Sequence, residues 1–279
     1  MYLDKNYIYD KVKEALREDS PYGDITSIFT QDPAAVCSGR LWAKEDFVLS
    51  GIEVAGAAFD ITDSSCRFTP AARDGDRLAY GSTVALVEGP AISVLTAERI
   101  ALNFLQRMSG IATMTAAFVE AVSHTKARIV DTRKTTPLLR MFEKYAVRCG
   151  GGINHRTGLS DGILIKDNHI AAAGGITAAV EAVRRQAAHT LKIEVEIKSL
   201  EQLEEALASG AHIIMLDNFS AEDMKKAVAV IDGRALTEAS GGVNIRTVRQ
   251  IAETGVDIIS VGALTHSVKA ADISLDLDG

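Results

Sequence analysis

Cysteine is scarce in this chain of 279 residues, which contains only Cys37, Cys66 and Cys149. No two of them have the CxxC spacing of a metal or redox site, and a chain of this length does not need disulfides to hold its core together. The cysteine content therefore fits a reducing compartment, and we expect a cytoplasmic protein.

Long apolar segments and an excess of positive charge are also missing. No run approaches 18 apolar residues, and the first twenty residues are polar where a signal peptide needs an apolar stretch. Thirty Lys and Arg against 37 Asp and Glu give a net charge of -7, which argues against general binding of nucleic acid or anionic membranes. The remaining composition, 47% hydrophobic with a mean hydropathy of +0.09, is that of a globular protein without a membrane span.

The first 122 residues change character twice. Apolar residues at helical spacing predict a helix over 7–17, which PYGD ends. Short apolar runs from residue 38 to 95 (GRLWA, DFVLSG, STVALVEG and AISVL) predict a mainly β segment. A stretch rich in Ala and Leu over 96–122 predicts a helix interrupted at Ser109-Gly110.

From residue 128 onward, short buried runs alternate with helical stretches. The runs are RIVD, GILI, KIEVE, HIIML, ALTEA and DIISV. Three of the helices have predicted starts at Ser199, Ser220 and Asn244, and each ends at a glycine. Strand ends recur every 20 to 35 residues or so, as in consecutive right-handed βα units. We therefore expect an α/β fold with an incomplete parallel barrel of about six strands.

Polar residues follow each of these runs. They are Asp131 to Lys134, Lys166 to Asn168, Glu196, Asp217-Asn218, Glu238 to Gly242, and Gly262. The carboxyl ends of parallel barrel strands meet at one mouth, where active sites form. Helix capping could explain any single Asp or Asn, but it does not explain Arg133, Lys134 and Lys166 together. The set therefore predicts a site.

Positive charge is concentrated between residues 131 and 156. This stretch holds six basic residues (Arg133, Lys134, Arg140, Lys144, Arg148 and Arg156) and two acids, Asp131 and Glu143. Six minus two gives a local charge of +4 in a chain of -7, so we expect a polyanionic ligand. Arg140, Lys144 and Arg148, at helical spacing, can alternatively form a solvated helix face.

Two glycine-containing loops, 239–244 (ASGGVN) and 261–267 (VGALTHS), lie between a strand and a helix start. Backbone N–H groups in such loops can approach a phosphate, and the helix dipole favours its charge. Each loop alone is plain turn chemistry, but two on adjacent barrel strands suit a phosphate site.

Several motifs together resemble those of nicotinate-nucleotide pyrophosphorylase (carboxylating), also called quinolinate phosphoribosyltransferase. They are DTRKTTP (131–137), GGGINHRTGLSDGILIKDNHI (150–170), EVEIKSLEQ (194–202), IMLDNFS (214–220), EASGG (238–242), VGALTHS (261–267) and ERIALNFLQRMSGIAT (98–113). The resemblance implies an N-terminal α/β sandwich domain over 1–105, to which 267–279 can return, and a barrel domain over 106–266. One departure is Leu138, where the family usually has Gly, and it bears on the flexibility of that loop.

The family's reaction joins quinolinate to 5-phosphoribosyl-1-pyrophosphate with Mg²⁺, giving nicotinate mononucleotide, pyrophosphate and CO₂ in NAD biosynthesis. The resemblance also implies a homodimer with shared active sites. The implied quinolinate ligands are Arg133, His155, Arg156 and Lys166, with Arg99 from the other subunit. Lys134, Glu196 and Asp217 are implied for the phosphoribosyl donor, the two carboxylates also for Mg²⁺, and Ser240, Gly241, Gly242 and Gly262 for the 5′-phosphate.

Other interpretations stay open. Lys166 could be the Schiff-base lysine of an aldolase, although the neighbouring KDNH and arginines favour anion binding. A related protein linked to molybdate uptake differs in the KDNH segment, which is intact here. A non-catalytic nucleotide-binding regulator would be expected to lack one of the charged groups, and this sequence has all of them. His124, His189 and His212 are expected on the surface or in packing roles, whereas His169 and His266 are undecided.

Overall fold

The structure, a computed structural model, describes residues 2–278, which form two compact units. The first unit comprises the chain up to Ala116, Met141–Gly151, and the chain from Val268 on; the second comprises Ala117–Arg140 and Gly152–Ser267. Residues 106–116 and 141–151, which we assigned to the barrel, thus fall in the first unit. Within the described part, no helix is both long and apolar enough to cross a membrane.

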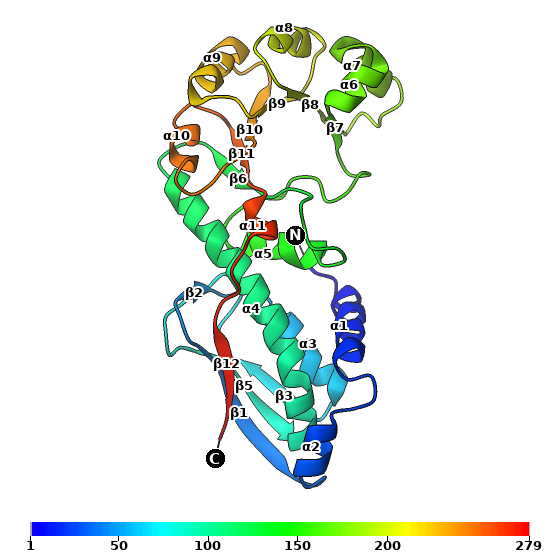
Figure 1. The fold of residues 1–279 in the computed structure, drawn as a ribbon, viewed down its shortest axis with the longest axis vertical. Coiled ribbons are helices and arrows are strands. Elements are labelled where there is room, and N and C mark those ends of the chain that lie inside the picture. The colour runs from blue at the N-terminus through cyan, green and yellow to red at the C-terminus, as the bar shows by residue number, and fades with distance from the viewer. Residues whose placement is uncertain (1, 279) are drawn as a thin grey trace. The chain divides into compact units, whose positions relative to one another are not determined.

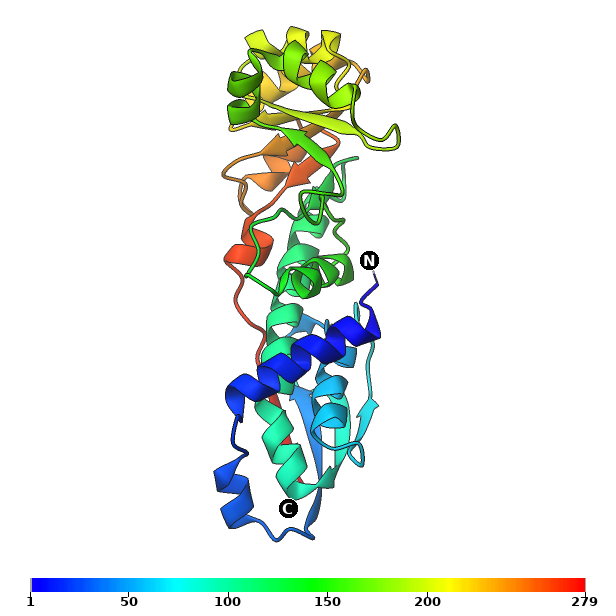
Figure 2. The ribbon, with the colours of Figure 1, turned by 90° about the vertical axis from the view of Figure 1, so that its right-hand side faces the viewer.

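The first unit is a four-stranded antiparallel sheet, in the order β12-β1-β5-β3, covered by helices. Burial alternates along β1 (Val36–Ala43) and β5 (Thr83–Pro90), so one face of the sheet is packed and the other is open. Helix α1 (Lys5–Asp19), the predicted opening helix, packs on α3 (Ile52–Thr62) on the packed side (Figure 2). The remaining elements are α2 (Ile25–Thr30), β2 (Phe47–Val48), β3 (Arg67–Pro70), β4 (Arg77–Leu78), α4 (Ala91–Val122), α5 (Arg140–Cys149) and β12 (Ile273–Leu277). This arrangement confirms the α/β sandwich.

The predictions for this unit were right in part. The segment 38–95 is mainly β, as expected, but it also contains α3, and AISVL, predicted as a β run, opens α4 instead. Helix α4 also continues through Ser109 and Gly110 without interruption. The buried Ser109 hydroxyl accepts the N–H of Ser50 at 3.0 Å, and a Cβ atom at Gly110 would clash with the carbonyl oxygen of Lys269. The two residues therefore serve close packing instead of ending the helix.

The second unit is a six-stranded parallel sheet in the order β6-β11-β10-β9-β8-β7, and it confirms all six predicted strands. β6 and β7 are the two edge strands of this sheet and do not pair with each other, so the barrel stays open between them. The strands are β6 (Arg128–Val130), β7 (Ile163–Ile165), β8 (Ile193–Ile197), β9 (Ile213–Asp217), β10 (Leu236–Ser240) and β11 (Ile258–Ser260). The helices on their outer side are α6 (Asp167–Ala173), α7 (Ile176–Arg184), α8 (Glu201–Ala208), α9 (Ala221–Ile231) and α10 (Val248–Ala252); α11 (Ala263–His266) follows β11 (Figure 1).

Of the three predicted helix starts, one is confirmed. Ser220 caps α9, and its hydroxyl accepts the N–H of Asp223 at 3.1 Å. Helix α8 begins after Leu200, and no side chain caps it as Ser199 was expected to. Asn244 instead forms a turn by accepting the N–H of Arg246, and α10 begins only at Val248.

Candidate functional site

The two-residue period of the strands sorts the inward-facing side chains of the barrel into layers. Glu194 and Glu196 are both buried on β8 and point to the same face, one layer apart. On β10, Glu238 and Ser240 have the same relation, and Ser240 lies in register with Asp217 of β9. The upper layer therefore brings Glu196, Asp217 and Ser240 to the carboxyl ends of neighbouring strands.

A cavity of about 610 Å³ opens at these strand ends. Ten of the twelve predicted site residues line it: Arg133, Lys134, His155, Arg156, Lys166, Glu196, Asp217, Ser240, Gly241 and Gly242.

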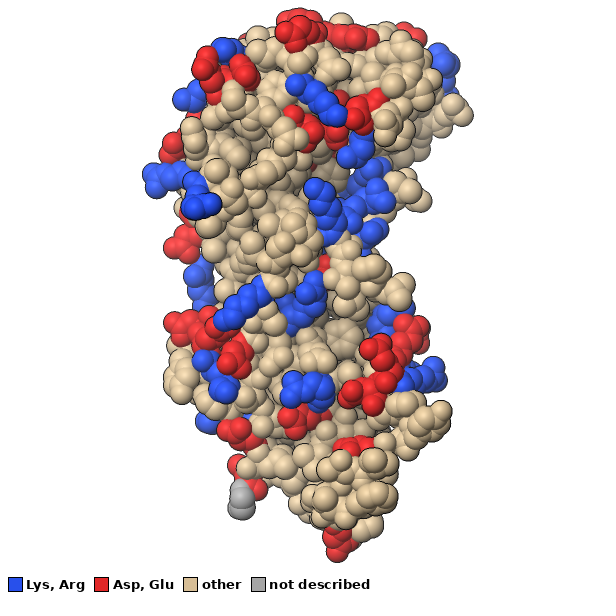
Figure 3. All heavy atoms as spheres, viewed as in Figure 1, with Lys and Arg blue, Asp and Glu red and all other residues tan. Residues whose placement is uncertain are grey.

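 The other two are Arg99, which lies in the first unit, and Gly262, which adjoins the cavity where it leaves room for the Lys134 side chain. Figure 3 shows Lys and Arg side chains next to Asp and Glu side chains over the barrel unit, so the two signs of charge are interspersed there. A cavity of this size, lined by both signs of charge, suits polar ligands.

The cationic side of the cavity is formed by the loops after β6 and before β7. Arg156 is partly buried, and its guanidinium donates to the carbonyl oxygen of Gly162 at 3.1 Å. Burial, and then the charge of Arg133, lower the pKa of Arg156. Both effects disfavour the charged guanidinium, so an anion bound beside it would stabilise it. Arg140 donates to Thr135 and to the Thr157 carbonyl oxygen, and so joins the two loops.

Lys166 connects the cationic side to the acidic side. Its Nζ lies 3.0 Å from Oε2 of Glu196, whose side chain is 9% exposed, whereas the Lys166 side chain is 46% exposed. The N–H of Lys166 donates to Nδ1 of His169 at 3.0 Å, which assigns this histidine to the start of α6. A second ion pair joins the same two strand ends with the charges exchanged: the acid, Asp167, follows β7, and the lysine, Lys198, follows β8, at 2.6 Å.

The loop after β10 requires glycine. Gly241 and Gly242 have φ of 95° and 61°, and a Cβ atom at Gly241 would clash with the side chain of Asn218. Asn218 itself donates its backbone N–H to the carbonyl oxygen of Ser240 at 2.9 Å, which ties the loops after β9 and β10 together. The result is a small, side-chain-free surface at the cavity wall.

Lys134 lies against the loop after β11. A Cβ atom at Gly262 would stand 3.1 Å from Cδ of Lys134 and 3.2 Å from the His266 ring, so glycine leaves room for both side chains. The hydroxyl of Thr265 donates to the carbonyl oxygen of Lys134 at 2.7 Å. Nearby, the exposed Leu138 adopts φ of 68°, a left-handed conformation that favours glycine, the residue that the resemblance led us to expect there.

His155 lies at the floor of the cavity, with both ring nitrogens engaged. Its Nε2 is 3.1 Å from Glu194, and its Nδ1 accepts the N–H of Arg156 at 2.7 Å. The fully buried Asp131 accepts the backbone N–H of His155 at 2.9 Å and an N–H of Asn154 at 2.6 Å. Sequence reasoning counted Asp131 among the polar residues at the strand ends without giving it a role of its own, and it did not single out Glu194, an acid within an apolar run.

Several predicted residues lie elsewhere. Arg99 is exposed on α4 in the first unit, where it lines a hollow with Gln106 and the segment 272–276. The alternative of a solvated helix face for Arg140, Lys144 and Arg148 was wrong in part, because Lys144 is fully buried and only Arg148 is exposed. His212 accepts the N–H of Ile193 at 3.0 Å, which is the expected packing role.

Glu196 and Asp217 are the carboxylates that could hold Mg²⁺ at this cavity. Both line it, and Asp217 accepts an N–H of Asn218 at 3.0 Å. Mg²⁺ is usually held by one or two carboxylates together with substrate phosphates. Two carboxylates beside an uncovered glycine loop therefore fit a metal ion that arrives with a phosphorylated substrate.

Comparison with known proteins agrees with this geometry. The N-terminal and C-terminal domain families of quinolinate phosphoribosyl transferase match residues 24–109 and 111–276. The chain is 45% identical over 262 residues to the probable nicotinate-nucleotide pyrophosphorylase [carboxylating] of Bacillus subtilis, covering 93% of this chain and 90% of the relative. It is 47% identical over 274 residues to the Mycobacterium leprae nicotinate-nucleotide pyrophosphorylase [carboxylating], covering 96% of each.

Solved structures give the same result over the whole length. The crystal structure of NadC from Streptococcus pyogenes has a TM-score of 0.96 at 45% identity, with 100% of this chain and 99% of that chain covered. The nicotinate-nucleotide pyrophosphorylase of Francisella tularensis has a TM-score of 0.95 at 40% identity, with 99% and 98% covered. The chain therefore belongs to the quinolinate phosphoribosyltransferase family.

Proposed function

We propose that this protein is a decarboxylating quinolinate phosphoribosyltransferase. It transfers the phosphoribosyl group of 5-phosphoribosyl-1-pyrophosphate to quinolinate and releases pyrophosphate and CO₂, leaving nicotinate mononucleotide for NAD synthesis. One observation carries the proposal: a single cavity joins a cationic side, an acidic side and a glycine loop. A non-catalytic regulator would not need all three.

Quinolinate is the ligand for the cationic side. Its two adjacent ring carboxylates match several cations, and Arg133, Arg156 and Lys166 line the same cavity. His155 holds the backbone of Arg156 beside them. Arg99 would complete this set from the partner subunit of a homodimer, since it lies in the first unit and is exposed. The cytoplasm is the compartment that the free cysteines favour.

The phosphoribosyl donor occupies the other side. Ser240, Gly241 and Gly242 offer backbone N–H groups for the 5′-phosphate, with Gly262 and Lys134 adjoining. Glu196 and Asp217 hold ribose hydroxyls or Mg²⁺, which when bound neutralises pyrophosphate charge. Lys134 adds a cation for the phosphate oxygens of the donor.

The reaction needs placement and charge stabilisation more than covalent help from the protein. As the C1–O bond to pyrophosphate breaks, C1 of the ribose becomes cationic, and the quinolinate nitrogen forms a bond to it from the opposite side. The carboxylates of Glu196 and Asp217, on the donor's side of the cavity, would stabilise that developing charge. The alkylated ring is a pyridinium, so the C2 carboxylate leaves as CO₂ while the ring carbon keeps the electron pair and takes up a proton.

Release of CO₂ from quinolinate labelled in its C2 carboxylate tests this function. We expect release with the phosphoribosyl donor and Mg²⁺ present and none without the donor. Nicotinate has no C2 carboxylate, so its turnover is followed by pyrophosphate release; it should react roughly 10²- to 10³-fold more slowly, because the cations that would face the missing carboxylate are left without a partner in the complex. Arg133→Ala should abolish turnover, whereas Arg148→Ala, an exposed arginine outside the cavity, should not. Comparable turnover of nicotinate, or release without the donor, would refute the assignment.

A further inference from the structure

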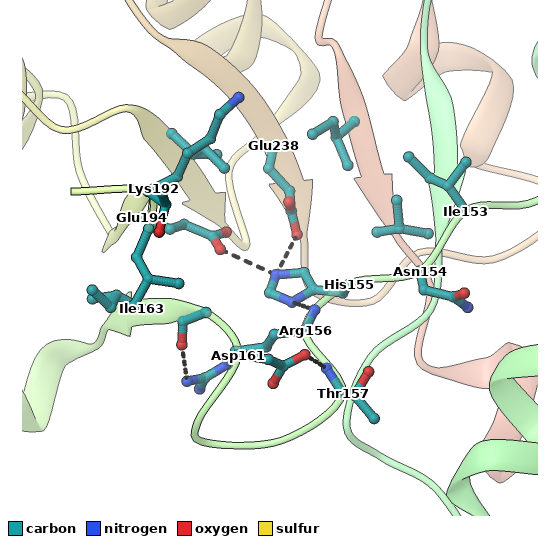
Figure 4. A pocket seen from close by; sticks show the side chains of 16 residues that line it. Ile153, Asn154, His155, Arg156, Thr157, Asp161, Ile163, Lys192, Glu194 and Glu238 are labelled. Carbon is teal, nitrogen blue, oxygen red and sulfur yellow. Dashed lines mark hydrogen bonds and ion pairs between the residues drawn. The ribbon is translucent and has the colours of Figure 1, made fainter. Parts of the chain in front are cut away.

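A second cavity, of about 580 Å³, lies inside the barrel one layer below the active-site cavity and shares His155 and Arg156 with it. Its most unusual feature is a buried cluster in which Glu194 of β8 and Glu238 of β10 point toward the His155 ring (Figure 4). The two glutamates are 5% and 2% exposed. Neither has a part in the reaction as described above.

The distances define the state of the imidazole. Nε2 of His155 is 3.1 Å from Oε2 of Glu194 and 3.5 Å from Oε1 of Glu238. Nδ1 accepts the backbone N–H of Arg156 at 2.7 Å, so it cannot carry a proton in this arrangement. This geometry favours the neutral ring with its proton on Nε2, facing the two carboxylates.

Stability alone does not account for the two glutamates. Burying a carboxylate is costly unless hydrogen bonds compensate, and Oε1 of Glu194 has no hydrogen-bond partner among the described residues. Glu238 receives a hydrogen bond from the Ser260 hydroxyl. Apolar residues of similar volume often replace buried ionic groups without loss of stability. The cluster is therefore better explained by what it does to His155.

We propose that Glu194 and Glu238 are positioning residues that hold His155 as the Nε2–H tautomer, so that Nδ1 fixes the backbone of Arg156 beside the quinolinate site. This inference rests on the proposed function. Asp131 fixes the N–H of His155 on the other side, so the segment is held at consecutive residues. The Arg156 side chain is further held by Gly162, whose carbonyl oxygen accepts a hydrogen bond from its guanidinium at 3.1 Å and whose lack of a Cβ atom leaves room for that of Arg156.

The tautomer is the link between the cluster and the substrate. If the proton moved to Nδ1, two N–H groups would face each other across the 2.7 Å that now separates Nδ1 from the Arg156 nitrogen. The backbone at Arg156 would have to shift, and its guanidinium would leave its present place. Displacing a binding group by about 1 Å can cost on the order of 10²-fold in rate.

Nitrogen-15 NMR of the imidazole tests the first step without any change to the cluster. The His155 signals, assigned by comparison with His155→Gln, should show a protonated Nε2 and an unprotonated Nδ1 at pH 7.5. A wild-type ring protonated on Nδ1, or on both nitrogens, would overturn the proposal whatever the variants do. This measurement does not require that the protein bind quinolinate.

Calorimetric binding of quinolinate to variants tests the second step. Replacing both glutamates by Met removes the acceptors at similar volume, and should mix the tautomers and weaken quinolinate binding about 10- to 100-fold. Replacing both by Gln keeps an acceptor oxygen at each position, and should restore the tautomer and most of the affinity. Lys192→Met, in the same cavity but not in contact with the ring, is the matched control.

The outcomes separate this proposal from the function on which it rests. A KM for the phosphoribosyl donor that stays within about threefold of wild type, with raised quinolinate KM, supports positioning. If the Met variant loses affinity for both substrates equally, or keeps full affinity for quinolinate, the positioning proposal is overturned while the proposed function stands. Should the Met variant not fold, the Gln variant still decides: loss of the Nε2–H tautomer with both acceptor oxygens present contradicts the proposal. Failure of the wild type to bind quinolinate would instead overturn the proposed function.

Discussion

Removing the Glu196 carboxylate should have opposite effects on the two substrates. Oε2 of Glu196 lies 3.0 Å from Nζ of Lys166. A cation that we assign to quinolinate binding is therefore paired with a carboxylate that we assign to the phosphoribosyl donor. In Glu196→Gln that ammonium loses its charged competitor and becomes free to bind quinolinate. We therefore expect tighter binding of quinolinate alone, together with poorer use of the phosphoribosyl donor.

The structure sets the size of the effect. The pair is neither fully buried nor fully exposed, because the Lys166 side chain is 46% exposed and that of Glu196 is 9% exposed. Ion pairs of this partly solvated kind contribute about 0.5–1 kcal/mol. Quinolinate no longer has to break this pair, so its dissociation constant should fall about two- to fivefold.

Isothermal titration with quinolinate alone, followed by steady-state kinetics with varied donor, measures both effects. Glu201→Gln is the matched control, because it removes the same charge at the exposed start of α8, outside the cavity. That variant should bind quinolinate as the wild type does. Weaker quinolinate binding in Glu196→Gln would refute the assignment of the two sides of the cavity, and an unchanged donor kcat/KM would refute the role of this carboxylate.

Three other predictions follow from single features of the structure. Gly110→Ala should lower the free energy of unfolding by about 1–3 kcal/mol in urea, because its Cβ meets backbone, while Gly158→Ala, whose Cβ would make only ordinary contacts at 3.7 Å or more, should not; equal stability would contradict the packing argument. Burial, and then the charge of a neighbouring glutamate, raise the pKa of Glu238 to about 7, so the native state binds the extra proton and loses stability as pH rises from about 4.5 to 7. The stability of Glu238→Gln relative to wild type should therefore increase over that range in urea unfolding, and a constant difference would contradict it. If Arg99 acts in the partner's site, mixing the inactive Arg99→Ala and Lys134→Ala proteins should restore about a quarter of wild-type activity, and confirmed mixed dimers without activity would contradict sharing.

The barrel could be predicted from the sequence because its signals are local. Each strand is a short apolar run, and each polar residue at its end follows directly in the chain, as Asp217 follows IIML on β9. Parallel strands then bring these ends together whatever the exact helix boundaries are. The first unit was harder, since α3 is an apolar helix whose residues also suit a strand. Ser109 and Gly110 gave a misleading signal because their role depends on contacts with Ser50 and Lys269, far away in the sequence.

The lower layer of the barrel carried a signal that went unused. Glu194 stands two residues before Glu196, and Glu238 stands two residues before Ser240, so the strand period places each glutamate on the inward face one layer beneath a mouth residue. A charged residue inside an otherwise apolar buried strand must find a partner in the interior. The sequence alone could not name that partner, because His155 lies on the irregular loop before β7, which is placed by a bridge between Ile153 and Val130 of β6. An acid at an inward position of a buried barrel strand therefore predicts a polar group inside the barrel, and here that group adjoins the arginine on which substrate binding is proposed to depend.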